Sequence, residues 1–147
     1  MILRDWFDFE VYNEFRAFIY QKKITSITQY NEYCFFPHLH ANKEEIGEAM
    51  KQIVCTEILP KITKLQNLVL DLILCKEGGK WTVKVVEINP LAEFAGTGLF
   101  SWEEDRKTLL GEDPFEFRIQ NEPPENALQN LPPTWADFIR SQNPKLF

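Results

Sequence analysis

The clearest pattern in the chain is a pair of apolar runs, Leu68–Leu74 and Trp81–Ile88, separated by the break Glu77–Lys80. Runs rich in β-branched and large apolar residues, bounded by glycine, are typical of two strands joined in a β-hairpin. The first run is apolar at nearly every position, which favours a strand buried on both faces. Asp71 interrupts this run, and an isolated carboxylate is costly to bury.

The loop length decides which residues of this hairpin face each other. With Gly78–Lys80 as a three-residue loop, Asp71 is predicted to lie directly opposite Glu87. Side chains alternate along a strand, so Glu87 and Asn89 share a face and complete an oxygen-rich cluster with Asp71. A slip of one residue would turn Glu87 to the other face.

This cluster has two interpretations. Two carboxylates opposed across strands repel each other, so a cation that neutralises them stabilises the pair. Oxygen ligands of this kind suit Mg²⁺ or Mn²⁺ that carries substrate phosphates. Alternatively, Asp71 and Glu87 are solvated residues on an edge hairpin with one face in water. The pattern identifies no catalytic residue.

Earlier in the chain, polar and apolar positions alternate over Glu14–Tyr20 and Ile24–Tyr30, on either side of Gln21–Lys23. This alternation predicts a first hairpin that carries Arg16. Later, Gly96–Gly98 is too short to cradle a phosphate and is interpreted as a turn.

Helical patterns flank these strands. Asn42 is expected to cap a helix over Lys43–Leu59, which Pro60 ends or bends. Ser101 with Glu104 forms a capping-box pattern before a short helix that ends at Leu109 or Leu110. The chain is therefore expected to be α+β, with a central antiparallel sheet and flanking helices.

Composition narrows the partners. The 147 residues are 44% hydrophobic and 26% charged, which suits a single core. A net charge of −6 and a pI near 5.0 argue against direct binding of nucleic acid, which calls for a basic patch. Protein surfaces or Mg²⁺-bound nucleotide are the expected partners.

The same sequence contains no apolar stretch of the roughly 20 residues that a membrane span needs, and its N-terminus has no signal-peptide core. Its three cysteines, Cys34, Cys55 and Cys75, are an odd number and show no Cys-x-x-Cys spacing. We therefore expect a cytoplasmic protein that does not bind membranes.

Five blocks, in this order, resemble the cell division cycle protein 123 family over roughly Ile2 to Ile119. They are Leu3–Phe7, Glu14–Ile19, Ile27–Tyr30, Glu87–Pro90 and Leu99–Glu104. The resemblance implies an ATP-grasp-like fold that binds ATP with Mg²⁺. It also implies a role as an assembly factor for the heterotrimeric translation initiation factor that carries initiator tRNA.

The resemblance assigns a role to four residues. Asp71, Glu87 and Asn89 match the family's metal-binding acid, second acid and asparagine, and would hold Mg²⁺ against the ATP phosphates. Arg16 matches an arginine that faces the same cleft, where a planar guanidinium suits phosphate oxygens. For Arg16 a surface ion pair is the alternative. The family usually has aspartate where Glu87 stands, and a shorter hairpin before it.

The resemblance covers only the second half of the ATP-grasp fold, because its first block begins at residue 3. Residues 1–120 are expected to form this C-terminal subdomain. Residues 121–147 form a proline-rich tail, and its short amphipathic piece Trp135–Ile139 suits docking or packing on the chain's own core. A natural short form, a truncated gene product and a cut piece of a longer protein remain open. A half-site is expected to bind ATP weakly or not at all.

Three functions follow as hypotheses. The first is an ATP- and Mg²⁺-binding assembly or chaperone-type factor that acts on a translation initiation factor subunit. The second is an ATP-dependent ligase of the ATP-grasp type, in which Mg²⁺ stabilises developing charge. The third is an interaction module that does not bind nucleotide. The oligomeric state stays open, and an exposed half-cleft would favour self-association.

Overall fold

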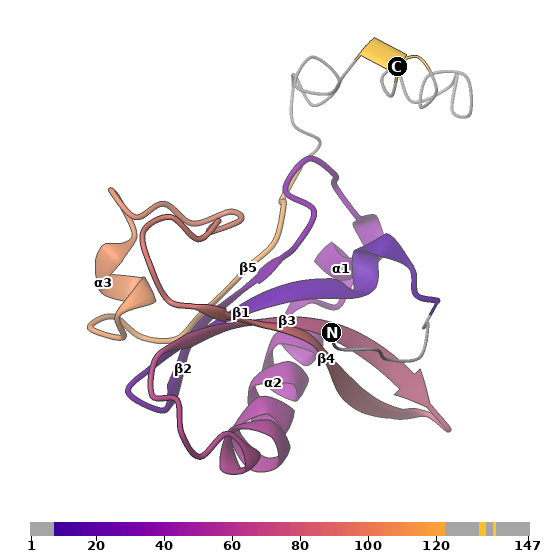
Figure 1. Cartoon of the computed structure of the whole chain (residues 1–147). Coiled ribbons are helices and arrows are strands. Elements are labelled where there is room, and N and C mark those ends of the chain that lie inside the picture. Colours follow the sequence, from indigo (N-terminus) through magenta and orange to yellow (C-terminus); the bar gives the residue numbers. More distant parts are fainter. Residues whose placement is uncertain (1–7, 123–132, 135–136, 138–147) are drawn as a thin grey trace.

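The computed structural model describes residues 8–122, 133, 134 and 137. The predicted Leu3–Phe7 block lies outside the described residues, as does the predicted Trp135–Ile139 piece apart from Asp137. Five strands form one sheet in the order β4-β3-β1-β2-β5 (Figure 1). Their bounds are β1 Glu14–Tyr20, β2 Lys23–Gln29, β3 Leu68–Glu77, β4 Lys80–Pro90 and β5 Glu116–Arg118.

Four of these strands are antiparallel neighbours, as the sequence predicts, and the fifth changes the sheet into a mixed one. β5 pairs parallel to β2, with Ser26 opposite Glu116 and Thr28 opposite Arg118. The helices are α1 Pro37–Ala41, α2 Lys43–Ile53 and α3 Arg106–Leu109. The α+β class is therefore confirmed.

The β3–β4 hairpin has a shorter loop than predicted. Glu77 pairs with Lys80, so Gly78 and Gly79 alone make the turn, with φ of 57° and 81°. A two-residue turn with positive φ at both positions fits the right-handed twist of the strands. The prediction of a three-residue loop was wrong.

The predicted Asp71–Glu87 pair nevertheless forms, because a β-bulge in β4 makes up for the residue by which the loop is shorter than predicted. Leu72 pairs with Val85, and the next pair is Asp71 with Glu87, so β4 holds one extra residue at this point. Such a β-bulge shifts the register by one residue and bends the strand.

The β1–β2 turn consists of Gln21 and Lys22, with φ of 49° and 64°. Positive φ is unfavourable for these residue types, and contacts with the loop before β3 hold them there. Lys22 Nζ donates to the carbonyl oxygens of Ile62 and Thr63, and the Gln21 amide donates to Asn67 Oδ1 at 2.8 Å.

The predicted long helix is divided. α2 ends at Ile53, and the chain continues through a π-helical turn, Val54–Ile58, and a 3₁₀ turn, Leu59–Lys61. Asn42 does not cap α2 with its side chain, because its Nδ2 donates to the His38 carbonyl at 2.8 Å. α1, which the sequence analysis did not predict, provides that carbonyl.

The main core lies between the sheet and α2, which crosses one face of the sheet (Figure 1). β3 is buried on both faces from Leu68 to Leu74, as predicted. A smaller cluster on the opposite face joins Phe18 and Val69 to Phe100 and Leu109 from the segment that contains α3. The main cluster includes Phe15, Ala17, Ile19, Ile27, Leu70 and Leu72 from the strands, with Ile46, Met50 and Val54 below them.

Candidate functional site

One row of polar residues crosses the whole sheet on the face opposite α2. The strand register aligns Glu87 with Asp71, Asp71 with Arg16, Arg16 with Thr28, and Thr28 with Arg118. Residues aligned across neighbouring strands project from the same face. The sheet therefore brings together side chains from all five strands.

Arg16 and Asp71 form the centre of this row. Arg16 Nε donates to Asp71 Oδ1 at 2.8 Å, and Arg16 Nη2 donates to Oδ2 at 2.9 Å. The two side chains are 14% and 3% exposed. This geometry corrects the surface ion pair suggested for Arg16, because the pair is largely buried. Paired donors of this kind give the strongest guanidinium–carboxylate contact.

Arg16 also contacts the segment after β4 and the ring of Tyr30. Its Nη1 donates to the Gly96 carbonyl at 2.7 Å, and its guanidinium lies 5.1 Å from the centre of the Tyr30 ring. In its contacts with the described residues, Arg16 therefore uses three of its five N–H groups, which leaves two for another acceptor.

Asn89 and Glu87 fit a hard cation. Asn89 Nδ2 donates to Asp71 Oδ2 at 3.0 Å, which orients the amide and leaves its oxygen as an acceptor. Glu87 is exposed on the edge strand, and among the described residues no side chain donates a hydrogen bond to its carboxylate. Among the described residues, Asp71 Oδ1 accepts a hydrogen bond from Arg16 Nε alone, which leaves one acceptor position on that oxygen. This donor set suits Mg²⁺, which prefers few carboxylates together with other oxygen ligands.

The electrostatic environment is acidic around Arg16. Burial and the nearby Asp71 raise the pKa of Glu14, while Arg16 lowers it. Burial and Asp71 likewise raise the pKa of Tyr30, and Glu14 and Glu87 contribute to the same rise. Among the described residues, the Arg16 guanidinium thus lies near the carboxylates of Asp71, Glu14 and Glu87, which favours binding of a further cation.

The segment after β4 is tied to the same row. The Leu99 amide donates to Thr28 Oγ1 at 3.3 Å. At Gly98, which has φ of +60°, an added Cβ would lie 2.7 Å from Thr28 Cγ2. The turn lies slightly later than the predicted Gly96–Gly98, because the Phe100 amide donates to the Thr97 carbonyl at 3.2 Å. The sequence did not predict that this segment packs directly on the site.

Arg118 closes the other end of the row. It makes two hydrogen bonds to Asp105, both 2.9 Å, and two to Glu116 at 2.8 and 2.9 Å. Its fifth N–H donates to the Leu99 carbonyl at 3.0 Å. The hydrogen bonds to Glu116, and to a smaller extent those to Asp105, raise the pKa of Arg118. The hydrogen bonds from Arg118 in turn lower the pKa of Asp105.

The predicted Ser101–Glu104 capping box is displaced by one residue. The Ser101 amide donates to Asp105 Oδ2 at 2.8 Å, and Ser101 Oγ accepts from the Glu103 amide at 3.2 Å. Asp105 therefore takes the role expected of Glu104, and it also holds Arg118.

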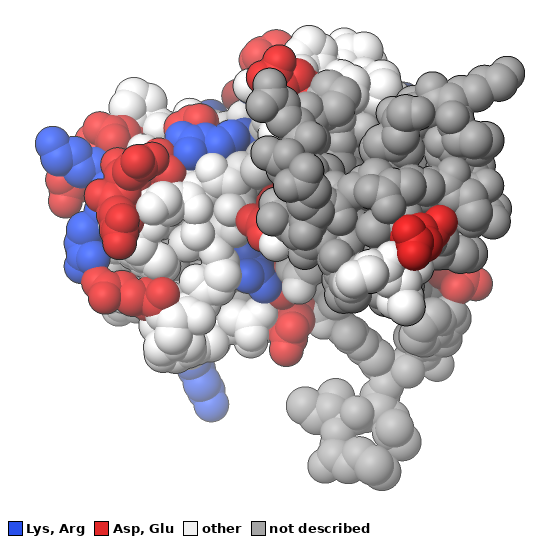
Figure 2. Space-filling view, turned by 90° about the horizontal axis from the view of Figure 1, so that it is seen from above, with Lys and Arg blue, Asp and Glu red and all other residues white. Residues whose placement is uncertain are grey.

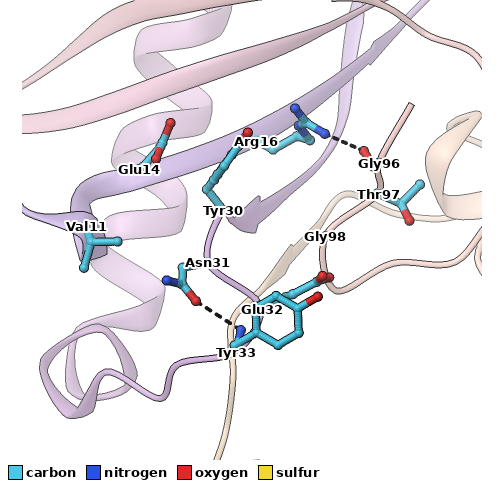
Figure 3. A pocket seen from close by; sticks show the side chains of 10 residues that line it. All are labelled: Val11, Glu14, Arg16, Tyr30, Asn31, Glu32, Tyr33, Gly96, Thr97 and Gly98. Atoms are coloured by element: carbon cyan, nitrogen blue, oxygen red, sulfur yellow. Dashed lines mark hydrogen bonds between the residues drawn. The ribbon is translucent and has the colours of Figure 1, made fainter. Parts of the chain in front are cut away.

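A groove of about 660 Å³ adjoins Arg16 (Figure 3). It lies between the start of β1, the loop that follows β2, and the turn after β4. Figure 3 shows Glu14 on one side of the groove and Gly96–Gly98 on the other, with Arg16 and Tyr30 between them and Arg16 hydrogen-bonded to Gly96. Its lining residues are Val11, Glu14, Arg16, Tyr30, Asn31, Glu32, Tyr33, Gly96, Thr97 and Gly98.

The surface seen from above shows acidic and basic side chains interspersed, with no broad basic patch among the coloured residues (Figure 2). This agrees with the net charge of −6. Within the part of the chain that the structure describes, no helix is long and apolar enough to cross a membrane.

The fold and the site define an α+β protein whose sheet has an acidic face centred on Arg16. The loop Gly96–Gly98, here called the covering loop, packs on this face. The chain belongs to the D123 family, because the family model described as D123 matches residues 1–134.

Two relatives illustrate this membership. The chain is 30% identical over 128 residues to the translation initiation factor eIF2 assembly protein of Vanderwaltozyma polyspora, covering 83% of this chain and 34% of that protein. It is 28% identical over 109 residues to the protein of the same name from Xenopus laevis, covering 74% and 31%. The chain therefore spans about a third of the length of these relatives.

Solved structures show the same fold. Cdc123 from Schizosaccharomyces pombe superimposes with a TM-score of 0.60 and 20% identity, covering 79% of this chain and 44% of that chain. Its C-terminally truncated form gives the same TM-score and covers 43% of that chain. The family resemblance and the fold class predicted from the sequence are thus confirmed. The roles of Arg16, Asp71, Glu87 and Asn89 stay predictions.

Proposed function

We propose that this chain is an assembly factor, or part of one, for a translation initiation factor, and that its arginine-centred face binds ATP with Mg²⁺. The membership in the D123 family supports the assembly role, because relatives carry the name translation initiation factor eIF2 assembly protein. The observation that carries the binding site is the cluster of oxygen donors beside Arg16 and Asp71.

Each residue of the cluster has a distinct part in this proposal. The Glu87 carboxylate and the Asn89 amide oxygen would hold Mg²⁺, with the remaining acceptor position of Asp71 Oδ1 as a third ligand. Bound Mg²⁺ would neutralise the phosphate charge. The two N–H groups that Arg16 retains would donate to phosphate oxygens.

Asp71 also acts as a positioning residue. It accepts from both Arg16 and Asn89, so it fixes the guanidinium and the amide relative to each other. Because Glu87 is exposed and Asp71 is buried, we expect cation affinity to depend on Glu87 directly and on Asp71 partly through the fold.

A second candidate is an interaction module that binds its partner without nucleotide. The Arg16–Asp71 pair favours it, because the guanidinium already neutralises the buried carboxylate. Under this alternative the polar row serves only to hold the segment after β4 on the sheet.

Calorimetric titration of Mg²⁺-ATP separates these candidates. We expect the parent chain to bind weakly, as half of a nucleotide site would, and Glu87→Gln to lose most of that binding. The matched control is Glu77→Gln, which removes the same charge from the other end of the hairpin, where Glu77 pairs with Lys84 at 3.4 Å. Equal binding by all three proteins, or no binding by the parent chain, would contradict the nucleotide site and support the module.

Two further assays address the assembly role. Immobilised chain is exposed to each purified eIF2 subunit with and without Mg²⁺-ATP, and retention of one subunit is expected. In parallel, ATP turnover is measured with carboxylate and amine acceptors, where release of ADP or phosphate would instead support the ligase predicted as an alternative from the sequence.

A further inference from the structure

The groove beside Arg16 has a chemical character of its own. Its walls combine two tyrosine rings, Tyr30 at 43% and Tyr33 at 42% exposed, with the carboxylates of Glu14 and Glu32. Both rings line the groove together with Glu14 and Glu32, next to the Arg16–Asp71 pair (Figure 3).

Glu14 is the key carboxylate. It is half-buried, and among the described residues no side chain donates a hydrogen bond or forms an ion pair with it. Burial and, after it, the charge of Asp71 raise the pKa of Glu14, and Arg16 offsets this rise only in part. A cation entering the groove would stabilise the ionised carboxylate.

Arg16 does not meet that need, although it lines the same groove. It is the one basic residue among the ten lining residues, and its charge is directed to Asp71 through two hydrogen bonds of 2.8 and 2.9 Å. Away from Arg16, the charged lining residues are Glu14 and Glu32, so this part of the groove is acidic and favours a cationic ligand.

The shape and chemistry select among cations. A planar guanidinium stacks flat on a tyrosine face while its N–H edge donates to a carboxylate in the same plane, whereas an ammonium is a compact point charge without this planar fit. The Arg16 guanidinium already lies 5.1 Å from the Tyr30 ring centre, so a tyrosine–guanidinium contact occurs at this site.

We propose that this groove binds an arginine side chain from an extended basic segment of the protein partner. The inference rests on the proposed function as a protein-binding factor and adds the chemistry of the segment that is recognised. The chain's net charge of −6 adds long-range attraction for such a segment.

The test uses the whole chain, labelled with ¹⁵N, without Mg²⁺ or nucleotide. It is titrated with the peptide acetyl-Gly-Arg-Gly-amide and with the same peptide carrying citrulline, which keeps the shape and removes the charge. We expect saturable amide shifts at residues 30–33 and 96–98 with the arginine peptide, and binding about threefold to tenfold weaker with citrulline.

Variants locate the effect. Glu14→Gln and Tyr33→Ala should each weaken binding of the arginine peptide by a similar factor. Tyr33 is an exposed loop residue, so its variant tests the groove even if the β1 variant folds poorly. Glu57→Gln, an exposed charge change on the side of the sheet that α2 covers, should leave binding unchanged.

Equal binding of both peptides, shifts confined to other surfaces, or full binding by Glu14→Gln and Tyr33→Ala would overturn the proposal. So would a dimer that dissociates in the Glu14→Gln variant, because a second copy would then fill the groove. Since no nucleotide is present, these outcomes are independent of the Mg²⁺-ATP titration. Nucleotide binding without arginine binding would refute the groove proposal alone.

Discussion

Asp71 on β3 and Arg16 on β1 face each other in register, and two hydrogen bonds of 2.8 and 2.9 Å join carboxylate to guanidinium beneath the protein surface. This pair connects the fold to the proposed site, because Asp71 also orients Asn89 and Arg16 also holds Gly96. A single contact therefore positions a candidate cation ligand, a candidate phosphate donor and the covering loop.

Asp71→Ala is expected to destabilise the fold strongly. It leaves the Arg16 guanidinium, with a side chain 14% exposed, without its counter-ion. Breaking one side of a buried pair costs about 3–5 kcal/mol. Urea denaturation measures the change in the free energy of unfolding. The control is Glu93→Ala, which removes the partner of Arg106 from a pair with side chains 57% and 68% exposed. That change should cost about 0–1 kcal/mol, and equal costs would refute a structural role for Asp71.

Gly98→Ala is expected to loosen the turn after β4. The residue has φ of +60°, and the new Cβ would lie 2.7 Å from Thr28 Cγ2. A non-glycine residue in this conformation costs about 1–2 kcal/mol, and the clash adds to that cost. Gly79→Ala separates the two effects, because Gly79 has φ of +81° with nothing within 4 Å of an added Cβ. Thermal unfolding should show a larger loss for Gly98→Ala, and an equal loss would mean that the Thr28 contact contributes nothing.

Acid is expected to release the segment held by Arg118. The hydrogen bonds from Arg118 and the Ser101 amide lower the pKa of Asp105 from its ordinary value of 3.8. An acid with a lowered folded pKa stabilises the fold above its unfolded pKa, and this contribution is lost as the pH falls through the folded pKa. The midpoint temperature of unfolding is measured at a series of pH values below neutral. It should fall less steeply with acid for Asp105→Asn than for the parent chain. Parallel curves would contradict this coupling.

The strands that carry the site could be predicted from the sequence more accurately than the turn and the bulge of the β3–β4 hairpin. The apolar run at Leu68–Leu74 gave the buried strand, because burial on both faces leaves a direct signature in composition. The pairing of Asp71 with Glu87 was predicted correctly from a wrong loop, since a two-residue turn and a bulge offset each other. A bulge at an edge strand has no clear signature in a single sequence, so its position could not be anticipated.

Contacts between distant segments were beyond reach of the sequence. The alignment of β1 with β3 brings Arg16 to Asp71, and the parallel pairing of β5 with β2 brings Arg118 to the same face. Local patterns specify strands and faces, whereas strand order depends on packing of the whole core. The same limit explains why Gly96–Gly98 was predicted as a turn without its contact to Arg16.

The most direct test of the account locates the cation itself. ¹⁵N-labelled chain is mixed with substoichiometric Mn²⁺ and ATP, because Mn²⁺ accepts the same oxygen ligands as Mg²⁺ and broadens nearby amide signals. Broadening is expected to centre on Glu87 and Asn89, to persist in Glu77→Gln and to disappear in Glu87→Gln. Broadening centred elsewhere, or unchanged in Glu87→Gln, would contradict the proposed site.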